Sequence, residues 1–196
     1  MNEIIRLAHP EDAAAILDVY RLFITDTAIS FEYTVPSIAE FAERIRGIAA
    51  EYPYLVYERD GKIEGYAYAH RYLERAAYQW DVEVTVYLSD AVRGSGIGAK
   101  LYAAIEKLLQ LQGIINLYAC ITASNQVSIN FHAKTGYKIV GTFHKAGFKL
   151  GEWQDVVWME KAIGCYSDKP QEPLSFTALN DADVAAVLGG FNEVRK

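Results

Sequence analysis

The sequence predicts one domain of mixed α and β structure followed by an extension. Stretches in which apolar and polar residues alternate, as in strands, lie between stretches in which apolar residues recur at helical spacing. Several expected strands follow one another through short turns, so the order is not the regular strand–helix alternation of a parallel sheet. The chain has 196 residues, of which 52% are apolar and 22% charged. At roughly 150 residues per domain, this length corresponds to one domain plus an extension. The apolar content is high enough to form a packed core.

The first quarter of the chain is expected to hold a short strand and two helices. Residues 4–7 form the strand, and Pro10 followed by two acids begins a helix. Proline fits the first turn of a helix, and acids favour the positive end of its dipole. Ser37 and Glu40 form a capping-box pattern that begins the second helix. Apolar residues at helical spacing follow both starts, which predicts that each helix buries one face.

Three strands are expected next. Asp60-Gly61 joins apolar runs over 54–59 and 63–71, and this dipeptide is a strong hairpin signal. Residues 80–88 then alternate strictly, which predicts a strand with one buried face. The elements expected after a glycine-rich segment are a long helix over 97–112, a strand over 117–122, a short helix over 126–134, and strands over 137–143 and 156–159.

The composition changes after Gly164. Residues 167–173 have the composition of a linker, with two prolines among polar residues. Residues 174–196 are expected to form a strand and then a helix that begins at an aspartate. The sequence therefore predicts a domain over 1–163 and a linker with a strand and helix extension over 164–196.

Charge and cysteine content exclude several classes of protein. The net charge of −6 argues against a protein that binds nucleic acid over its whole surface. Cys120 and Cys165 are too few for a disulfide framework, which fits a reducing compartment. Residues 1–6 carry charge where a signal peptide needs an apolar run, and no segment approaches the ~18 apolar residues of a membrane span. We expect a soluble cytoplasmic protein that binds neither nucleic acid nor membrane.

The glycine-rich segment Arg93-Gly94-Ser95-Gly96-Ile97-Gly98 predicts a phosphate site. It lies between a strand and a long helix, where glycines let backbone N–H groups face a ligand and the helix start adds partial positive charge. Arg93 adds a permanent cation. The alternative is a tight turn that binds nothing.

Two other nucleotide-binding patterns fail on their context. Residues 94–99 satisfy the dinucleotide pattern, but the following strand over 117–122 has no acid to hold a ribose. The kinase-type phosphate loop needs Gly-Lys-Ser/Thr, where this chain has Gly98-Ala99-Lys100-Leu101.

The segment resembles the pyrophosphate-binding signature of the GNAT N-acetyltransferases, Arg/Gln-x-x-Gly-x-Gly/Ala, with Arg93, Gly96 and Gly98 in the fixed places. Further segments are similar to the phosphinothricin acetyltransferase branch, and the resemblance extends from about residue 4 to residue 163. These segments are 52–56, 80–87, 125–132 and 147–156.

The resemblance implies a central, mostly antiparallel twisted sheet flanked by helices. It also implies acetyl-CoA as cosubstrate and transfer of acetyl to the amino group of a small amino-acid-like molecule, such as phosphinothricin or methionine sulfoximine or sulfone. A homodimer is implied as well, and the extension is expected to pack on its own domain or to add to that interface. The alternatives are an enzyme for another amine or a protein N-terminus, and a non-catalytic CoA-binding interaction module.

Resemblance also assigns the residues that would hold CoA. The glycine-rich segment 93–98 would hold the pyrophosphate, and the backbone of Val86, Tyr87 and Leu88 would pair with the pantetheine arm. Asn125 would bond to the CoA arm and Lys134 would contact the nucleotide phosphates, with Ser128 beside them. Asn125 and Ser128 are equally typical of a helix cap, and Lys134 of a solvated surface.

Glu83 and His132 are the candidate catalytic residues. Glu83 lies in a strand of Val, Thr and Tyr, so partial burial is expected to raise its pKa and to suit it as a general base. The alternative is a carboxylate on a solvated strand face. His132 stands where many GNAT enzymes have a tyrosine, and it would protonate the thiolate or accept the amine proton. The alternative is a histidine whose hydrogen bonds are satisfied within the helix.

The acceptor site is expected to be aromatic. Phe31, Tyr72, Tyr78 and Trp80 would form its walls, or they would simply lie in the core. Arg75 is a candidate clamp for an acceptor carboxylate, and Glu83 and Thr85 would face the acceptor. The remaining histidines, His9, His70 and His144, show no paired spacing, so no metal site is expected. Gln154 and Leu150 depart from residues usual in the branch, which affects acceptor specificity rather than the CoA site.

Overall fold

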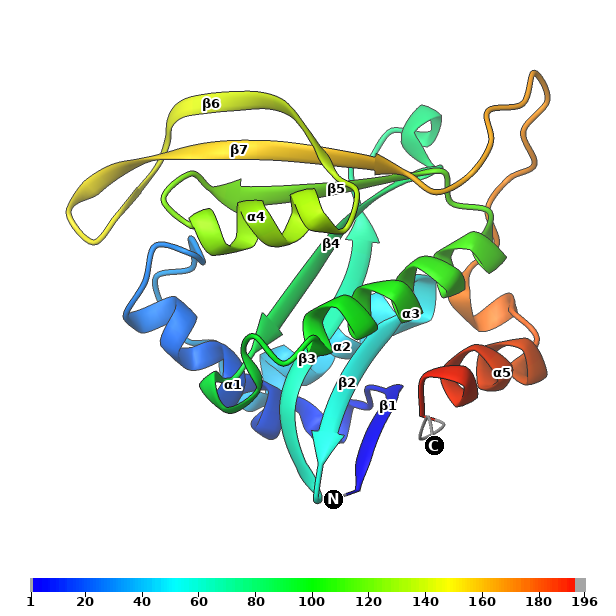
Figure 1. The fold of residues 1–196 in the computed structure, drawn as a ribbon, viewed down its shortest axis with the longest axis horizontal. Helices are drawn as coiled ribbons and strands as arrows, with labels where there is room; N and C mark the ends of the chain where they lie inside the picture. The colour runs from blue at the N-terminus through cyan, green and yellow to red at the C-terminus, as the bar shows by residue number, and fades with distance from the viewer. Residues whose placement is uncertain (1, 193–196) are drawn as a thin grey trace.

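A seven-stranded sheet with helices on both faces forms the domain (Figure 1). The computed structural model describes residues 2–192. The strands are β1 Glu3–Leu7, β2 Tyr54–Arg59, β3 Lys62–Arg71, β4 Asp81–Leu88, β5 Asn116–Thr122, β6 Lys138–Lys149 and β7 Glu152–Ala162. The helices are α1 Ala13–Thr25, α2 Ile38–Glu51, α3 Ile97–Gln112, α4 Gln126–Lys134 and α5 Asp181–Asn192. Short 3-10 turns lie at Pro10–Asp12, Ala76–Tyr78, Asp90–Val92 and Phe176–Ala178.

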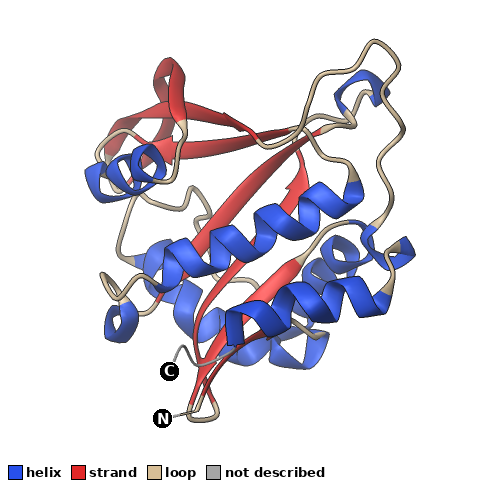
Figure 2. Cartoon of the chain, turned by 45° about the vertical axis from the view of Figure 1, so that its right-hand side comes forward, coloured by secondary structure: helices blue, strands red, loops and turns tan. Residues whose placement is uncertain are grey.

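The sheet has the order β1-β2-β3-β4-β5-β7-β6, and only the β4–β5 pair is parallel. This confirms the expected mixed fold with a mostly antiparallel sheet. Helices α1 and α2 cover one face, and α3 and α5 cover the other (Figure 2). Each face buries its own apolar cluster, as the alternation along the strands requires.

Local signals predicted the start of α2 and one turn correctly, while the helix expected from Pro10 begins with a 3-10 turn over Pro10–Asp12 and becomes α1 at Ala13. Ser37 Oγ accepts the N–H of Glu40, and the Glu40 carboxylate accepts the N–H of Ser37 at 2.8 Å, so the capping box closes at the start of α2. Asp60 and Gly61 both adopt positive φ, 51° and 82°, as a tight hairpin between β2 and β3 requires.

The β6–β7 hairpin is much longer than the predicted strands 137–143 and 156–159. Its two strands extend to Lys149 and Glu152, where Leu150 and Gly151 form a second turn with positive φ. The pairing register shifts twice along β6, and each irregularity interrupts the period-2 alternation. The sequence pattern therefore reveals only part of each strand.

The strand predicted in the extension is wrong within the described residues. The backbone of Leu174 is bonded to Gln112 at the end of α3, through both its N–H and its carbonyl at 2.8 Å, so the chain there lies on a helix end and not on a sheet edge. A 3-10 turn and α5 follow, and they bury Phe176 and Val184 in the cluster that includes α3. Residues 193–196 of the predicted extension lie outside the described residues. The boundary between residues 163 and 164 stays a prediction.

At its far end the extension covers the edge of the sheet. The side-chain amide of Asn192 bonds to both backbone groups of Ile5 on β1, at 2.7 and 2.9 Å. One of the two predicted outcomes is thus confirmed, because the described part of the extension packs on its own domain. No helix within residues 2–192 is long and apolar enough to cross a membrane.

Candidate active site

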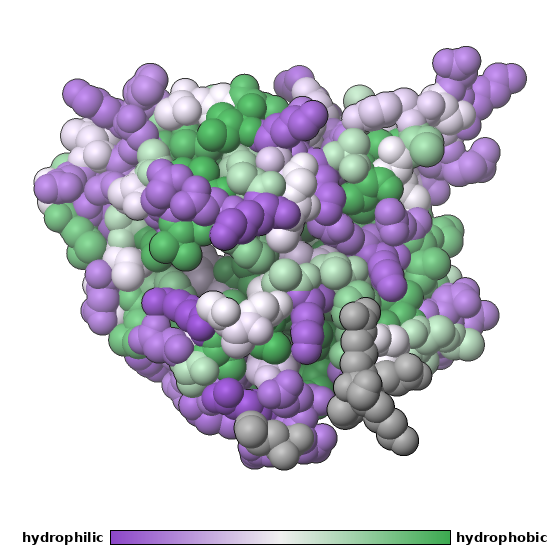
Figure 3. All heavy atoms as spheres, viewed as in Figure 1, coloured by the Kyte–Doolittle hydropathy of each residue, from purple (hydrophilic) through white to green (hydrophobic). Residues whose placement is uncertain are grey.

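The central feature of the site is an opening between β4 and β5. The two strands pair only at Asp81–Glu83 and then diverge, as Figure 1 shows. In the same view the space-filling surface is hollowed where they separate (Figure 3). The backbone N–H of Ser89 donates to the carbonyl of Glu64 on the neighbouring strand β3. In an antiparallel pair, every second residue directs its backbone N–H and C=O toward the partner strand, and the residues between them direct theirs to the other side. The backbone groups of Val86 and Leu88 therefore face the opening. This free strand edge suits an extended, polar ligand arm.

Tyr87 differs from its two neighbours. Its backbone faces β3, and its partly buried ring packs against aromatic residues of α1, 4.7 Å from the ring centre of Tyr20 and 4.8 Å from that of Phe23. Its place in the structure is therefore the core between α1 and the sheet.

The glycine-rich segment lies at the end of this opening. Gly94 and Gly96 have φ of 74° and 87°, values that favour glycine, and Gly96 caps α3. The first N–H groups of α3 have no acceptor within the helix, so they are available to an anion. A Cβ on Gly98 would lie 3.4 Å from both Leu88 and Phe131, so the glycine lets the helix start lie close to β4 and α4. These donors and this close approach fit a pyrophosphate.

Arg93 contributes a cation beside these donors. Its guanidinium pairs with Asp90 at 2.7 Å and lies 5.2 Å from the ring centre of Phe23, while more than half of the side chain stays exposed. The exposed face of the guanidinium remains available to a phosphate.

Glu83 lies at the point where β4 and β5 begin to diverge. Its side chain is only 21% exposed, and burial raises the pKa of its carboxyl above the ordinary range, an effect that nearby His70 partly opposes. A carboxylate with a raised pKa is a stronger base when ionised. Among the described residues, the side chain of His70 on β3 lies beside Glu83, with Nε2 3.9 Å from Oε2.

His132 is buried between α4 and α3. Its Nδ1 donates to the carbonyl of Ser128 at 2.8 Å, and its Nε2 accepts from the hydroxyl of Tyr102 at 2.9 Å. Burial lowers the pKa of the imidazole, so the neutral form is favoured. Both ring nitrogens are occupied, which agrees with the alternative of a satisfied helix histidine.

The start of α4 is capped as the sequence suggested. The side chain of Asn125 accepts the N–H of Ser128 at 3.2 Å, so these two residues have a structural role whatever else they bind. Lys134 lies exposed in the last turn of the same helix, where a cation suits the helix dipole.

An aromatic cluster stands on the same sheet face as Glu83. The ring of Tyr72 stacks on Tyr118 at 4.2 Å, with Trp158 at 5.6 Å and Tyr78 at 6.4 Å edge-on. Tyr118 is also the register partner of Glu83. The sequence analysis missed Tyr118 and Trp158, although Tyr118 alternates with the buried apolar residues of β5.

Arg75 caps the 3-10 turn that carries Tyr78. Within the part of the chain that the structure describes, no carboxylate lies within ion-pair distance of its guanidinium. Arg75 is thus a cation available to an acceptor carboxylate. Thr85 lies on the same face of β4 as Glu83, opposite Tyr68 of β3.

Phe31 is not in contact with this cluster but lies near the other end of β5. Its ring packs on Gly147, where even a Cβ would clash, and the hydroxyl of Thr122 holds the loop through the carbonyl of Ala28. Lys149 fixes the same loop: its buried Nζ donates to the carbonyls of Ile24 and Ser30 at 2.8 Å and to that of Glu32. No motif predicted this lysine, because its three acceptors lie more than 100 residues away in the chain.

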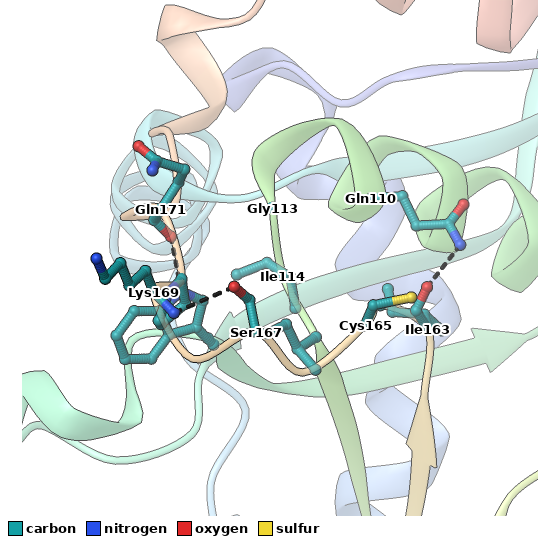
Figure 4. Close-up of a pocket in the computed structure, with 12 residues that line it drawn as sticks. Gln110, Gly113, Ile114, Ile163, Cys165, Ser167, Lys169 and Gln171 are labelled. Atoms are coloured by element: carbon teal, nitrogen blue, oxygen red, sulfur yellow. Dashed lines mark hydrogen bonds between the residues drawn. The ribbon is translucent and has the colours of Figure 1, made fainter.

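Trp80 is turned away from the expected acceptor wall. Its indole N–H donates to the carbonyl of Gln171 in the linker at 2.8 Å. It thereby lines a separate cavity of about 470 Å³ beneath the linker (Figure 4). Among residues 2–192 no three His, Cys, Asp or Glu side chains are grouped as a metal site would require.

Comparison with known proteins agrees with this architecture. The family model described as acetyltransferase (GNAT) domain matches residues 5–158. A phosphinothricin N-acetyltransferase of Streptomyces viridochromogenes is 34% identical over 157 residues, 80% of this chain and 86% of that protein. An L-methionine sulfoximine/L-methionine sulfone acetyltransferase of Pseudomonas aeruginosa is 30% identical over 165 residues, 82% of this chain and 94% of that protein.

A solved structure is similar over most of the chain. It is a GNAT superfamily phosphinothricin acetyltransferase from Sinorhizobium meliloti in complex with AcCoA, with a TM-score of 0.82 and 34% identity, covering 88% of this chain and 95% of that one. The parting of β4 from β5, the glycine-rich segment at its end and these relatives together lead to one conclusion: the chain belongs to the GNAT acetyltransferase family.

Proposed function

We propose that this enzyme acetylates the amino group of a small amino-acid-like acceptor, with Glu83 as the general base. The observation that carries the proposal is the position of Glu83. It lies at the apex of the β4–β5 opening, on the sheet face that also carries the aromatic cluster of Tyr72, Tyr78, Tyr118 and Trp158.

The proposed cosubstrate site follows the opening. Acetyl-CoA supplies an activated acyl group when bound. The N–H groups of segment 93–98 and the guanidinium of Arg93 would hold the pyrophosphate, and the free backbone edge at Val86 and Leu88 would hold the pantetheine arm. Asn125 at the cap of α4, with Ser128 and Lys134 in the helix, would border the other side.

Glu83 would remove the proton from the acceptor. An amine with a pKa near 10 enters as ammonium, so it needs a base before it can attack. Burial raises the pKa of Glu83, which strengthens its carboxylate form as a base. We give His132 a positioning role, because Tyr102 and Ser128 occupy both of its nitrogens and the bond to Tyr102 ties α4 to α3.

The acceptor would lie against the aromatic cluster. The guanidinium of Arg75 would pair with its carboxylate, and Thr85 and Phe31 would border it from the sheet and from the α1–α2 loop. Relatives named for phosphinothricin and for methionine sulfoximine or sulfone support an acceptor with a second, tetrahedral polar group.

A panel of amino acids and amines tests the proposal, with acetyl-CoA as donor and release of the CoA thiol as readout. We expect turnover with phosphinothricin or methionine sulfoximine, and loss of turnover in Glu83→Gln with unchanged affinity for CoA. An Arg75→Gln variant should raise KM for acceptors that carry a carboxylate and leave KM unchanged for those that lack one. Turnover confined to peptide N-termini would contradict the acceptor class, and full activity of Glu83→Gln would contradict the base.

We also propose that two copies associate in the cytoplasm through the β6–β7 hairpin. Six large apolar side chains of this hairpin are exposed, which is more than one region of a monomeric protein's surface normally shows. They are Ile139, Val140, Phe143, Phe148, Leu150 and Trp153. Both cysteines are free, which fits a reducing compartment. Light scattering should give twice the mass of the chain, and Phe143→Glu should halve it; a monomeric unmodified chain would contradict the proposal.

A further inference from the structure

The residue that faces Glu83 across the β3–β4 ladder is His70. The two are register partners, so their side chains stand on the same face of the sheet. Nε2 of His70 lies 3.9 Å from Oε2 of Glu83. The histidine side chain is 36% exposed and the glutamate 21%, so His70 is the more solvent-accessible of the two.

The orientation of the imidazole suits a proton acceptor. Nδ1 of His70 lies 3.0 Å from the carbonyl of Arg71. A carbonyl only accepts, so Nδ1 carries the proton in the neutral ring and the lone pair of Nε2 faces Glu83. A protonated Glu83 would donate to this nitrogen, and an imidazolium would donate back to the carboxylate. The pair therefore holds one proton favourably in either place.

The other titratable groups around Glu83 are poor proton carriers near neutral pH. Burial, with the charge of Glu83, raises the pKa of Cys120 to about 12, and burial raises that of Tyr118 to about 12. The pKa of each neighbouring tyrosine is raised by burial as well. These tyrosines are Tyr68 on β3, Tyr72 after β3 and Tyr102 on α3. Among the described neighbours of Glu83, His70 is the one imidazole, the side-chain type that most often shuttles protons in enzymes.

We propose that His70 takes from Glu83 the proton that Glu83 has removed from the acceptor ammonium, and passes it to solvent. This inference rests on the proposed role of Glu83. The O–H bond of the carboxyl breaks, an Nε2–H bond forms, and the imidazolium then gives a proton to water, so only a proton moves. For this transfer the 3.9 Å between Nε2 and Oε2 has to shorten to hydrogen-bond length. His70 acts through Glu83 and has no contact of its own with the acceptor.

The first test is the pH profile of a His70→Gln variant, which keeps a polar side chain that does not titrate. We expect kcat to fall about tenfold, less than the roughly 10²- to 10⁴-fold that a general base contributes. KM for acetyl-CoA should stay unchanged. The acid limb of kcat/KM should move to higher pH, since the cation that opposes the raised pKa of Glu83 is gone. Added imidazole should restore kcat in a concentration-dependent way.

The matched control is His144→Gln. His144 is 78% exposed on the β6–β7 hairpin, where it pairs with Asp155 at 3.0 Å. The His144→Gln substitution should leave both kcat and the pH profile unchanged.

A second test does not depend on turnover. In NMR spectra recorded over a pH series, the ring signals of His70 should report the ionisation of Glu83 as an inflection that is absent in Glu83→Gln. Identical curves in the two proteins would overturn the coupling. A His70→Gln enzyme with unaltered kcat and pH profile, beside an inactive Glu83→Gln, would overturn the relay alone. An active Glu83→Gln would overturn the proposed base and the relay with it.

Discussion

Replacing Lys149 by methionine tests how the acceptor side of the site is held in place. The ammonium of Lys149 is buried and donates to the backbone carbonyl of Ile24 in the last turn of α1 and to two carbonyls of the α1–α2 loop, the segment that carries Phe31. Methionine keeps the length and the apolar stem of the side chain but removes all three donors. The substitution therefore isolates the hydrogen bonds from the packing.

The expected loss of stability follows from these contacts. A hydrogen bond to a charged group contributes about 1.5–3 kcal/mol. Three bonds from one nitrogen do not add fully, and the buried ammonium itself carries a desolvation penalty, which lowers its pKa. We therefore expect a loss of about 3 kcal/mol for the whole set. For a chain of this length that corresponds to a fall in Tm of roughly 6–12 °C.

Thermal unfolding and acceptor kinetics measure the two consequences. Lys149→Met should melt earlier and should raise KM for the acceptor several-fold, while KM for acetyl-CoA stays unchanged because the glycine-rich segment is elsewhere. The control is Lys138→Met, an exposed lysine on the same strand β6. A Lys149→Met enzyme that melts within 1–2 °C of the unaltered enzyme, or whose acceptor KM does not change, would refute the reasoning (a shift of that size is about 0.5 kcal/mol).

Three further predictions follow. Gly96→Ala should weaken CoA binding measured by calorimetry, because a Cβ at φ of 87° strains the cap of α3 by about 1–2 kcal/mol; equal affinity would contradict the proposed site. Burial lowers the pKa of His132 in the folded state, so the unfolded chain binds the proton more tightly. The free energy of unfolding should therefore decrease as pH falls from about 6.5 through the folded pKa. Urea unfolding at several pH values should show a smaller decrease in His132→Gln. Truncation after Gly164 should lower Tm and promote association, because it removes Phe176 and Val184 from the apolar cluster that includes α3 and uncovers the edge of β1. An unchanged melt would show that α5 adds nothing.

The sequence predicts best those features that depend on neighbours in the chain. Ser37 with Glu40 and Asp60 with Gly61 act over three residues or fewer, and the structure confirms both. The glycine-rich segment is equally local, and its place between a strand and a helix was predicted from its own residues. Element type was therefore more predictable than element length.

Features that depend on distant pairing could not be found in this way. The aromatic cluster needs the parallel register that sets Tyr118 beside Glu83, 35 residues apart by their numbers. The contact of Glu83 with His70 needs the register of the β3–β4 ladder. The separation of β4 from β5 has no signal in either strand, because both remain strands after their pairing stops.

The amide of Asn192 has a consequence for self-assembly. A sheet can in principle grow without limit by adding chains at both of its outer strands. Here a side chain bonds to Ile5 where an eighth strand would otherwise attach, which leaves β6 as the one uncovered border among the described residues. If two molecules paired through their β6 strands, neither would have another free sheet edge to which a third molecule could add. Such an assembly would stop at a closed pair and would not form a fibre.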